Sequence, residues 1–307
     1  MNRAFIFPGQ GSQIVGMGKD FLNSFSEAQE TFKIVDDDLG YKLSDIIFNG
    51  PEDKLTLTVN TQPALMAVSV AILNVIKKQT GKDIKNLCSF VAGHSLGEYS
   101  ALCGAGSISL EDTAKLLQIR GNSMQEAYPI GKGAMAACIG INLSDLEDII
   151  SGSDCDIAND NIEGQIVISG DNDIIDKKIS ILKDLGFKAI KLKVSAPFHS
   201  RLMKPAEIKM AAALEQTTIN LPIIPVIANV TAKPIIDPKE IKRNLVNQVC
   251  GRVRWRETLE FFAQQEIEEI IEIGSGKILT GMIKKTAHQF KCTNIGTVEE
   301  FEEFLNR

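Results

Sequence analysis

Ser95, His199 and Arg120 are far apart in the sequence, yet they are the residues of this chain best suited to nucleophilic chemistry. Ser95 is the centre of a G-x-S-x-G pentapeptide that directly follows the apolar run 87–92. A nucleophile elbow places its serine on a tight turn between a strand and a helix, and its glycines let the neighbouring backbone pass closely. The sequence therefore predicts a nucleophilic serine. The alternative is an ordinary strand-to-helix turn with a capping serine.

A serine hydroxyl is a weak nucleophile without a base, and the chain has only three histidines. His94 adjoins the serine, so we expect its side chain to point elsewhere. His288 follows two lysines, and we expect it on a solvated helix face. His199, where the chain re-enters the core, is the predicted base, and a structural loop histidine is the alternative. No Asp or Glu stands out as its partner, and a backbone carbonyl could orient the imidazole equally well.

Arg120 is the residue expected to set the class of substrate. It lies in an otherwise apolar helical stretch that includes Leu116, Leu117 and Ile119. A guanidinium in the cleft would pair bidentately with a substrate carboxylate. A surface arginine paired with a nearby acid is the alternative. An oxyanion hole would use the backbone N–H of Leu96 and a second donor from the loop 8–11.

The elements that must position these residues alternate between strand and helix. Short apolar runs predict strands at 4–7 and 87–92, and helical spacing predicts helices at 61–81 and 110–127, the first capped by Thr61 with Pro63 in its first turn. This order indicates an α/β fold with a doubly wound, largely parallel sheet. The serine elbow is typical of an α/β-hydrolase-like core.

The glycine-rich stretch 129–133 marks a change in composition and predicts a hinge that opens an inserted subdomain. The pattern that follows is β-α-β-β-α-β, with strands at 134–139, 155–158, 165–169 and 189–194 and helices at 143–151 and 171–185. This is the ferredoxin-like order. The expected division is a core of residues 1–130 and 198–307 and a small subdomain of residues 131–197. Further elements are expected as helices at 205–215 and 241–249, a helix from Trp255, and strands at 224–228 and 267–273.

Composition excludes several classes of function. The chain has 307 residues, 44% of them apolar, and a net charge of −6, which argues against general nucleic-acid binding. No apolar run approaches about 20 residues, and the first apolar run meets Pro8 too early for a signal peptide, so a cytoplasmic protein is expected. Six scattered cysteines predict reduced thiols rather than a zinc site or disulfides.

Two glycine-rich stretches resemble nucleotide-binding loops but do not match them. A dinucleotide fingerprint starting at Gly9 would need glycine where Ile14 stands. A Walker A loop ending at Lys277 would need glycine at Ile271 and Ser or Thr at Ile278. We therefore expect neither a dinucleotide nor ATP.

Taken in order, the motifs resemble the family of malonyl-CoA:acyl carrier protein transacylases of fatty-acid synthesis and the related acyltransferase domains of polyketide synthases. The resemblance runs almost end to end. It rests on the stretches 5–13, 61–64, 93–98, 120–125, 133–137 and 197–200, and on Asn229, Gln248, Trp255 and the turn 272–274.

The resemblance implies a catalytic set. Ser95 would become acylated, with His199 as its base. The backbone N–H groups of Gln10 and Leu96 would hold the oxyanion. A backbone carbonyl near Gln248 would orient the histidine in place of an acid.

The resemblance also implies a substrate pocket. Arg120 would bind the free carboxylate of a malonyl group, and Gln62, Met124 and Asn161 would help to line the pocket. Phe198 would narrow the space beside the α-carbon. The family commonly has Asn-x-Pro-x-Gln where this chain has Asn-Ile-Glu-Gly-Gln from Asn161 onward, a departure that bears on the role of Asn161.

The reaction implied is a two-step malonyl transfer from malonyl-CoA to the phosphopantetheine thiol of an acyl carrier protein, with no metal or redox cofactor and a monomeric enzyme. The alternatives are an acyl hydrolase or thioesterase using the same serine, an acyltransferase serving a polyketide synthase, and an inactive binding scaffold. An acidic carrier protein would need a basic surface, for which we expect Arg201, Lys277, Lys284 and Lys285.

Overall fold

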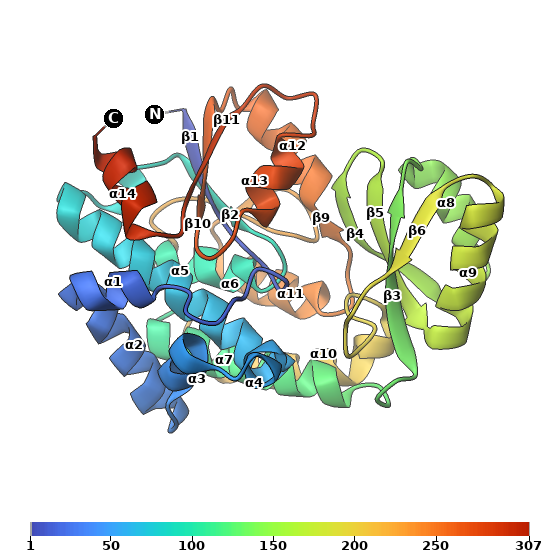
Figure 1. Cartoon of the computed structure of the whole chain (residues 1–307), viewed down its shortest axis with the longest axis horizontal. Helices are drawn as coiled ribbons and strands as arrows, with labels where there is room; N and C mark the ends of the chain where they lie inside the picture. Colours follow the sequence, from blue (N-terminus) through green and yellow to red (C-terminus); the bar gives the residue numbers. More distant parts are fainter. Residues whose placement is uncertain (1, 307) are drawn as a thin grey trace.

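The computed structural model describes residues 2–306 and contains two sheets, each with helices packed against it (Figure 1). The larger sheet has the strand order β11 (Lys291–Ile295), β10 (Glu269–Ile273), β1 (Arg3–Phe7), β2 (Phe90–Gly93), β7 (Val226–Ile227) and β8 (Pro234–Ile235). All its pairings are parallel except that of β7 with β8. The prediction of a doubly wound, largely parallel sheet is confirmed.

Strand β1 shows how the large sheet gains two buried faces. Phe5 and Phe7 pack into one hydrophobic cluster, whereas Ala4 and Ile6 pack into the other. Successive side chains of a strand point to opposite faces, so a strand that is apolar throughout requires cover on both sides.

Helices provide that cover on both faces of the large sheet (Figure 1). The helices outside the inserted segment are α1 (Lys19–Ser24), α2 (Ser26–Leu39), α3 (Leu43–Asn49), α4 (Glu52–Thr56), α5 (Thr58–Thr80), α6 (Gly97–Gly104), α7 (Leu110–Glu126), α10 (Lys204–Gln216), α11 (Pro238–Gln248), α12 (Trp255–Gln264), α13 (Ile278–Ile283) and α14 (Val298–Leu305), with the 3-10 turns η1 (Ile84–Asn86) and η2 (Arg201–Met203).

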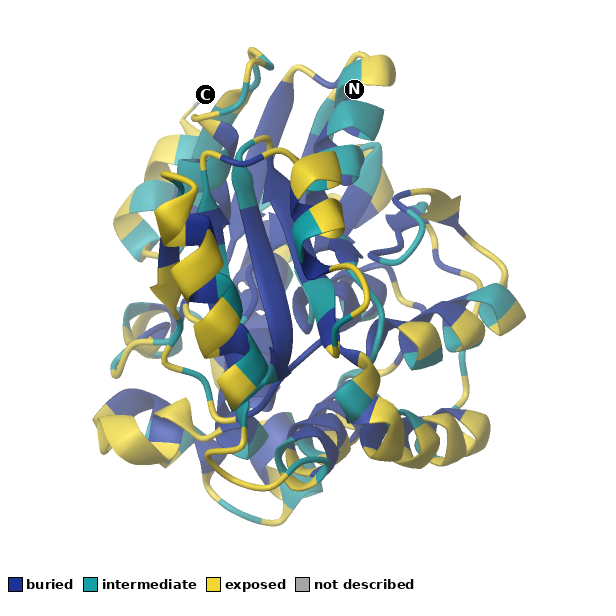
Figure 2. Cartoon of the chain, turned by 90° about the vertical axis from the view of Figure 1, so that its right-hand side faces the viewer, coloured by how far each residue is buried: buried dark blue, intermediate teal, exposed yellow. Residues whose placement is uncertain are grey.

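The smaller sheet has the order β6 (Lys188–Lys191), β3 (Gly133–Ile139), β5 (Gln165–Asp171), β4 (Cys155–Ile162) and β9 (Val253–Arg254). Its first four strands are antiparallel and have the ferredoxin-like order, with α8 (Leu143–Ile150) and α9 (Asn172–Asp184) between them in the chain. Figure 2 shows buried strands beside helices whose outer faces are exposed. Strand β9 lies outside the inserted segment, yet it pairs in parallel with β4.

Helix α5 differs from its prediction at the N-terminal end. It begins at Thr58 rather than after Thr61, so Pro63 lies inside the helix. Thr61 does not cap it, because its hydroxyl donates to the carbonyl of Leu55. The helix is long and apolar enough to cross a membrane, but 89% of its most apolar 18-residue window is buried within the fold. That burial is typical of a core helix.

Candidate active site

Ser95 lies on a strained turn between β2 and α6, with a backbone φ of 54°. A Cβ added to Gly93 would lie 1.9 Å from the carbonyl group of Gly97, and one added to Gly97 would lie 2.3 Å from the carbonyl oxygen of Phe7. Only glycine fits at either position, because the atoms it meets belong to the backbone. The turn is therefore built so that the Ser95 hydroxyl projects into a cavity that it helps to line.

His199 lies next to the serine, although 104 residues separate them in the chain. Ser95 Oγ is 2.7 Å from His199 Nε2. His199 Nδ1 donates to the backbone carbonyls of Gln248, at 2.9 Å, and Gly251, at 3.2 Å. Since a carbonyl can only accept, the proton is on Nδ1, and Nε2 is free to accept the Ser95 proton.

The imidazole of His199 is neutral in this environment. Burial, followed by the positive charge of Arg120, lowers the pKa of His199 from 6.5 to about 3, while the hydrogen bond to Gln248 opposes the shift. A general base must be unprotonated before the reaction begins. His199 therefore has the protonation state and the contact that proton removal from Ser95 requires.

Arg120 is buried, with 1% of its surface exposed, on the face of α7 that also carries Leu116 and Met124. Residues four apart share a helix face, so the core packing of these neighbours carries the guanidinium inward. Its Nη1 donates to Gln62 Oε1 at 2.8 Å, and its Nη2 donates to Ser95 Oγ at 3.1 Å and Gln248 Oε1 at 2.9 Å. These three hydrogen-bond acceptors are all neutral.

A cavity of about 330 Å³ joins the predicted residues, and Ser95 and His199 both line it. The other predicted residues on its wall are Gln10, Gln62, Leu96, Arg120, Met124 and Phe198. Gln248 lies behind this wall, where its backbone carbonyl contacts His199 and its side chain contacts Arg120. The structure thus brings together residues from the loop after β1, helices α5 and α7, and the segment after the small subdomain.

Asn161 is placed differently from its prediction. It is buried but does not line the cavity, and its Oδ1 accepts from His94 Nε2 at 2.8 Å. Asn159, two residues earlier on β4, lines the cavity instead. Bulges in β4 break the simple alternation of side chains, so the sequence spacing did not reveal which asparagine faces inward. His94 itself lines the cavity, with its ring edge against Trp255.

Three further polar residues around the Ser95 turn, which do not line the cavity, also had no predicted role. Thr58 Oγ1 lies 3.3 Å from Ser95 Oγ, at the first turn of α5. Asn229 Oδ1 accepts from the Ser95 backbone N–H at 2.7 Å, and its Nδ2 donates to the carbonyl of Gly93 at 2.7 Å. Glu98 accepts from Gln248 and Asn229 behind the elbow. Glu98 and Asn229 belong to stretches that carried the family resemblance, which was the available signal.

Two of the four cations expected on a carrier-binding surface are already paired. Arg201 forms a bidentate ion pair with Asp156, and Lys277 pairs with Glu300 at 2.7 Å. Lys285 lines a separate groove. The expectation of one free basic surface from these residues is not met for Arg201 and Lys277.

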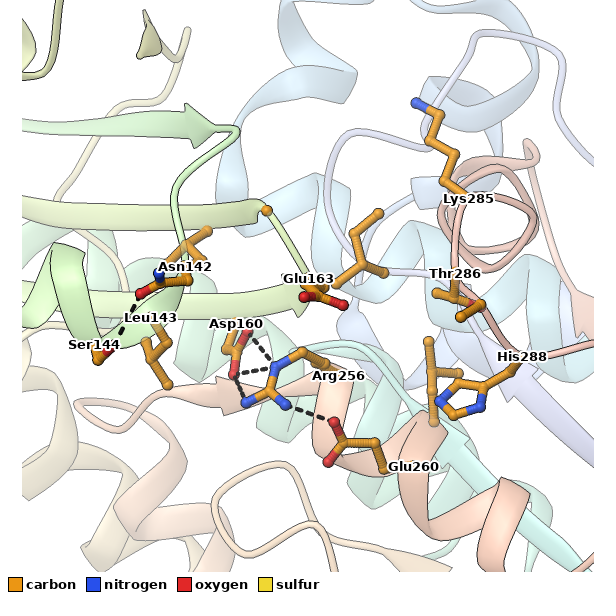
Figure 3. A pocket seen from close by; sticks show the side chains of 15 residues that line it. Asn142, Leu143, Ser144, Asp160, Glu163, Arg256, Glu260, Lys285, Thr286 and His288 are labelled. Carbon is orange, nitrogen blue, oxygen red and sulfur yellow. Dashed lines mark hydrogen bonds and ion pairs between the residues drawn. The ribbon is translucent and has the colours of Figure 1, made fainter. Parts of the chain in front are cut away.

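That groove, of about 920 Å³, is larger than the cavity at Ser95, and it lies between the small subdomain, α12 and the segment that follows α13. None of the predicted catalytic or pocket residues lines it. Its floor carries Arg256, which pairs with Asp160 of β4 and Glu260 of α12 (Figure 3). His288 also lines it, in a bend after α13, so the prediction of a helical position for His288 is wrong.

Comparison with known proteins identifies the family of the chain. The model of the acyl transferase domain family matches residues 4–303. The chain belongs to the acyl transferase family. Among its relatives, the malonyl CoA-acyl carrier protein transacylase of Bacillus subtilis is 40% identical over 305 residues, which are 97% of this chain and 95% of the relative. The resemblance drawn from the motifs is therefore confirmed.

Solved acyl transferases have the same fold. An acyl-carrier-protein-S-malonyltransferase from Bartonella henselae superposes with a TM-score of 0.96 and 51% identity, over 100% of this chain and 99% of the other. A malonyl-transacylase solved in complex with a type II PKS acyl-carrier protein superposes with a TM-score of 0.94 and 38% identity, over 99% of each chain. The whole of the chain is thus accounted for by the acyl transferase fold.

Proposed function

We propose that this chain transfers a malonyl group from malonyl-CoA to the phosphopantetheine thiol of an acyl carrier protein through a malonyl ester on Ser95. The observation that carries the proposal is Arg120. It is a buried cation 3.1 Å from the Ser95 hydroxyl, and no ion pair joins it to a carboxylate within residues 2–306. A buried cation that has only neutral hydrogen-bond acceptors and no ion-pair partner is costly. An acyl group that carries its own carboxylate would supply the missing anion.

The first half-reaction loads the enzyme. Ser95 Oγ attacks the thioester carbonyl carbon while its proton passes to His199 Nε2, and the carbonyl oxygen becomes an oxyanion held by the backbone N–H groups of Gln10 and Leu96. The bond from carbon to sulfur then breaks, and His199 returns the proton to the departing CoA sulfur. The products are malonyl-Ser95 and CoA thiol.

The second half-reaction reverses these steps with a different thiol. The carrier thiol gives its proton to His199 and attacks the malonyl ester, and Ser95 leaves with that proton restored. Arg120 holds the malonyl carboxylate through both halves, Gln62 helps to fix the guanidinium, and Phe198 and Met124 shape the space for the acyl group. This chemistry uses groups of the chain alone and calls for no metal or redox cofactor. We place the reaction in the cytoplasm and assign it to a monomer.

A competition experiment tests the proposal. The protein is incubated with equal amounts of malonyl-CoA, acetyl-CoA and methylmalonyl-CoA, and the Ser95 peptide is analysed by mass spectrometry. We expect a malonyl adduct on Ser95, none in Ser95→Ala, and its passage to holo-acyl carrier protein faster than to water. Loss to water at the same rate would favour the hydrolase, and the absence of an adduct would favour the inactive scaffold.

A further inference from the structure

Glu98 is a buried carboxylate that the proton transfers above do not use. It lies in the first turn of α6, three residues after Ser95, with 1% of its surface exposed. Placing an ionisable group there is costly, and it does not line the cavity that would receive substrate. Its contacts therefore need a reason other than substrate binding.

A single oxygen of Glu98 makes all its hydrogen bonds. Oε2 accepts from Gln248 Nε2 at 2.7 Å and from the Asn229 backbone N–H at 3.0 Å. Oε1 is buried and has no hydrogen-bond partner among the described residues. The two donors come from segments that are far from α6 in the sequence, so Glu98 joins the elbow to both of them.

Through Gln248, Glu98 fixes the orientation of an amide at the centre of the site. Gln248 Nε2 also donates to the Ser95 carbonyl at 3.0 Å, and Gln248 Oε1 accepts from Arg120 at 2.9 Å. A flipped amide would turn its NH₂ group toward the guanidinium, which has no acceptor. The acceptor on Glu98 therefore keeps the Gln248 oxygen facing Arg120, while the backbone of the same residue orients His199.

Through Asn229, Glu98 supports the strained elbow. With its backbone N–H held by Glu98, Asn229 bonds the Ser95 N–H and the Gly93 carbonyl with its side chain. A left-handed φ at a serine persists only where the surroundings over-determine it. The hydrogen bonds of Asn229 to Ser95 and Gly93 help to hold Ser95 in this backbone conformation.

We propose that Glu98 is a positioning residue of the transfer, whose hydrogen-bond acceptor sets the Gln248 and Asn229 amides and through them aligns Ser95, His199 and Arg120. The inference rests on the proposed malonyl transfer. It assigns Glu98 the role of a hydrogen-bond acceptor rather than a proton-transfer role. A neutral amide in its place should therefore preserve most of the rate of Ser95 acylation.

The test compares Glu98→Gln with Glu98→Met in single-turnover acylation of Ser95 by malonyl-CoA and by acetyl-CoA. Glutamine keeps an acceptor oxygen, whereas methionine has similar length and none. We expect Glu98→Met to slow acylation by both acyl groups about 10²-fold, as small misplacements of reacting groups do. Glu98→Gln should recover most of that loss. Normal rates in Glu98→Met, or equal losses in the two variants, would overturn the proposal.

Glu272 provides the matched control. It is a fully buried carboxylate that accepts from the backbone N–H groups of Leu279 and Thr280, and it does not line the cavity. Glu272→Met should lower the melting temperature without slowing acylation of the folded fraction. An equal slowing in Glu272→Met would mean that loss of any buried carboxylate has this effect, and the proposal would fail.

Gln248→Met is the second variant if Glu98→Met does not fold. It removes the amide that Glu98 holds but keeps the backbone carbonyl that accepts from His199. We expect the same loss with both acyl groups, and normal acylation would contradict the inference. The wild-type protein separates the two proposals: if it forms no malonyl-Ser95, the proposed function is wrong, whereas normal labelling of both wild type and Glu98→Met overturns only the role of Glu98.

Discussion

Arg120 is the residue that we propose selects an acyl group with a free carboxylate. Its three hydrogen-bond acceptors are neutral, so a malonyl carboxylate would gain a full counter-charge in a desolvated setting. We expect Arg120→Ala to lower kcat/KM for malonyl-CoA roughly 10²-fold, which is a loss of about 3 kcal/mol of transition-state stabilisation. Acetyl transfer should be retained or increased. Steady-state assays with both thioesters measure this.

Arg120→Lys is the matched control for that substitution. It keeps the positive charge but loses the planar fork that pairs with a carboxylate bidentately, so its malonyl transfer should fall between those of wild type and Arg120→Ala. Equal loss of malonyl and acetyl transfer in Arg120→Ala would show that Arg120 has a structural role.

The acid limb of the pH profile should reveal the buried imidazole. The pKa of His199 is lowered from 6.5 to about 3, so kcat/KM with acetyl-CoA should stay constant as pH falls through 6.5. Acetyl-CoA is the substrate of choice because its acyl group has no carboxylate to titrate. Arg120→Ala removes one cause of the lowered pKa, so its acid limb should move to higher pH. Identical acid limbs in the two proteins would show that the Arg120 charge does not act on His199.

At this scale the sequence predicts residues whose chemistry is local and misses those whose role depends on approach in space. Ser95 could be predicted because the glycines on either side of it indicate a tight turn. His199 could be predicted because the chain has only three histidines to consider as the base. Thr58 could not be predicted, since it reaches Ser95 only where α5 and α7 pack closely. There, a Cβ on Gly121 would lie 2.7 Å from the Thr58 carbonyl oxygen.

Among the elements, the elbow has the least room for change. In Gly93→Ala the new Cβ would overlap the Gly97 backbone, so β2 and α6 would have to separate. We expect a loss of stability of about 4 kcal/mol or more and no detectable acylation of Ser95. Gly281→Ala, in α13, is the control, because the new Cβ would meet nothing within 4 Å. We expect this substitution to stabilise the protein by about 0.4–1 kcal/mol. Wild-type acylation in Gly93→Ala would contradict the geometry of the turn.

The ion pair in the groove of Figure 3 fastens β4 to α12. Asp160 is 1% exposed and Arg256 is 29% exposed, with 2.9 Å between Asp160 Oδ2 and Arg256 Nη2. Removing the arginine leaves a buried carboxylate, so we expect Arg256→Ala to cost about 2–3 kcal/mol, less than a fully buried pair would. Urea denaturation measures the cost.

The double variant Asp160→Asn/Arg256→Ala is the control for that pair, because it removes both charges with the same truncation of the arginine side chain. It should be more stable than Arg256→Ala alone. If the two variants are equally unstable, the contribution of Arg256 lies in the packing of its side chain rather than in its charge.

The long elements were predictable and the short ones were not. Helix α7 carries a regular apolar stripe and a capping serine, and it was predicted to within one residue. Helices α1, α3 and α4 have five to seven residues, too few for a 3.6-residue period to stand out, and they exist through packing. The start of α5 was misplaced because a proline usually marks a first turn, whereas here burial of the surrounding helix outweighs the lost donor.

For the whole molecule, the buried carboxylate at Glu98 makes stability depend on pH. Burial raises the pKa of Glu98 from 4.5 to about 7, so its contribution is complete below pH 4.5 and is lost as pH rises through 7. Glutamine at position 98 does not titrate. The melting temperature of Glu98→Gln minus that of wild type should therefore be larger at pH 8 than at pH 5. A difference that stays constant with pH would mean that Glu98 has an ordinary pKa in the folded protein.

One short segment, residues 248–255, connects the two sheets. It begins with the Gln248 and Gly251 carbonyls that hold His199, continues as β9 on the edge of the small sheet, and ends at Trp255 against His94. A displacement of the small subdomain that widened the cleft for an incoming carrier arm would pull directly on the groups that aim the imidazole. The carbonyls that orient His199 and the strand that pairs with β4 are at most six residues apart in the chain, so the position of the small subdomain and the orientation of the imidazole depend on the same short segment.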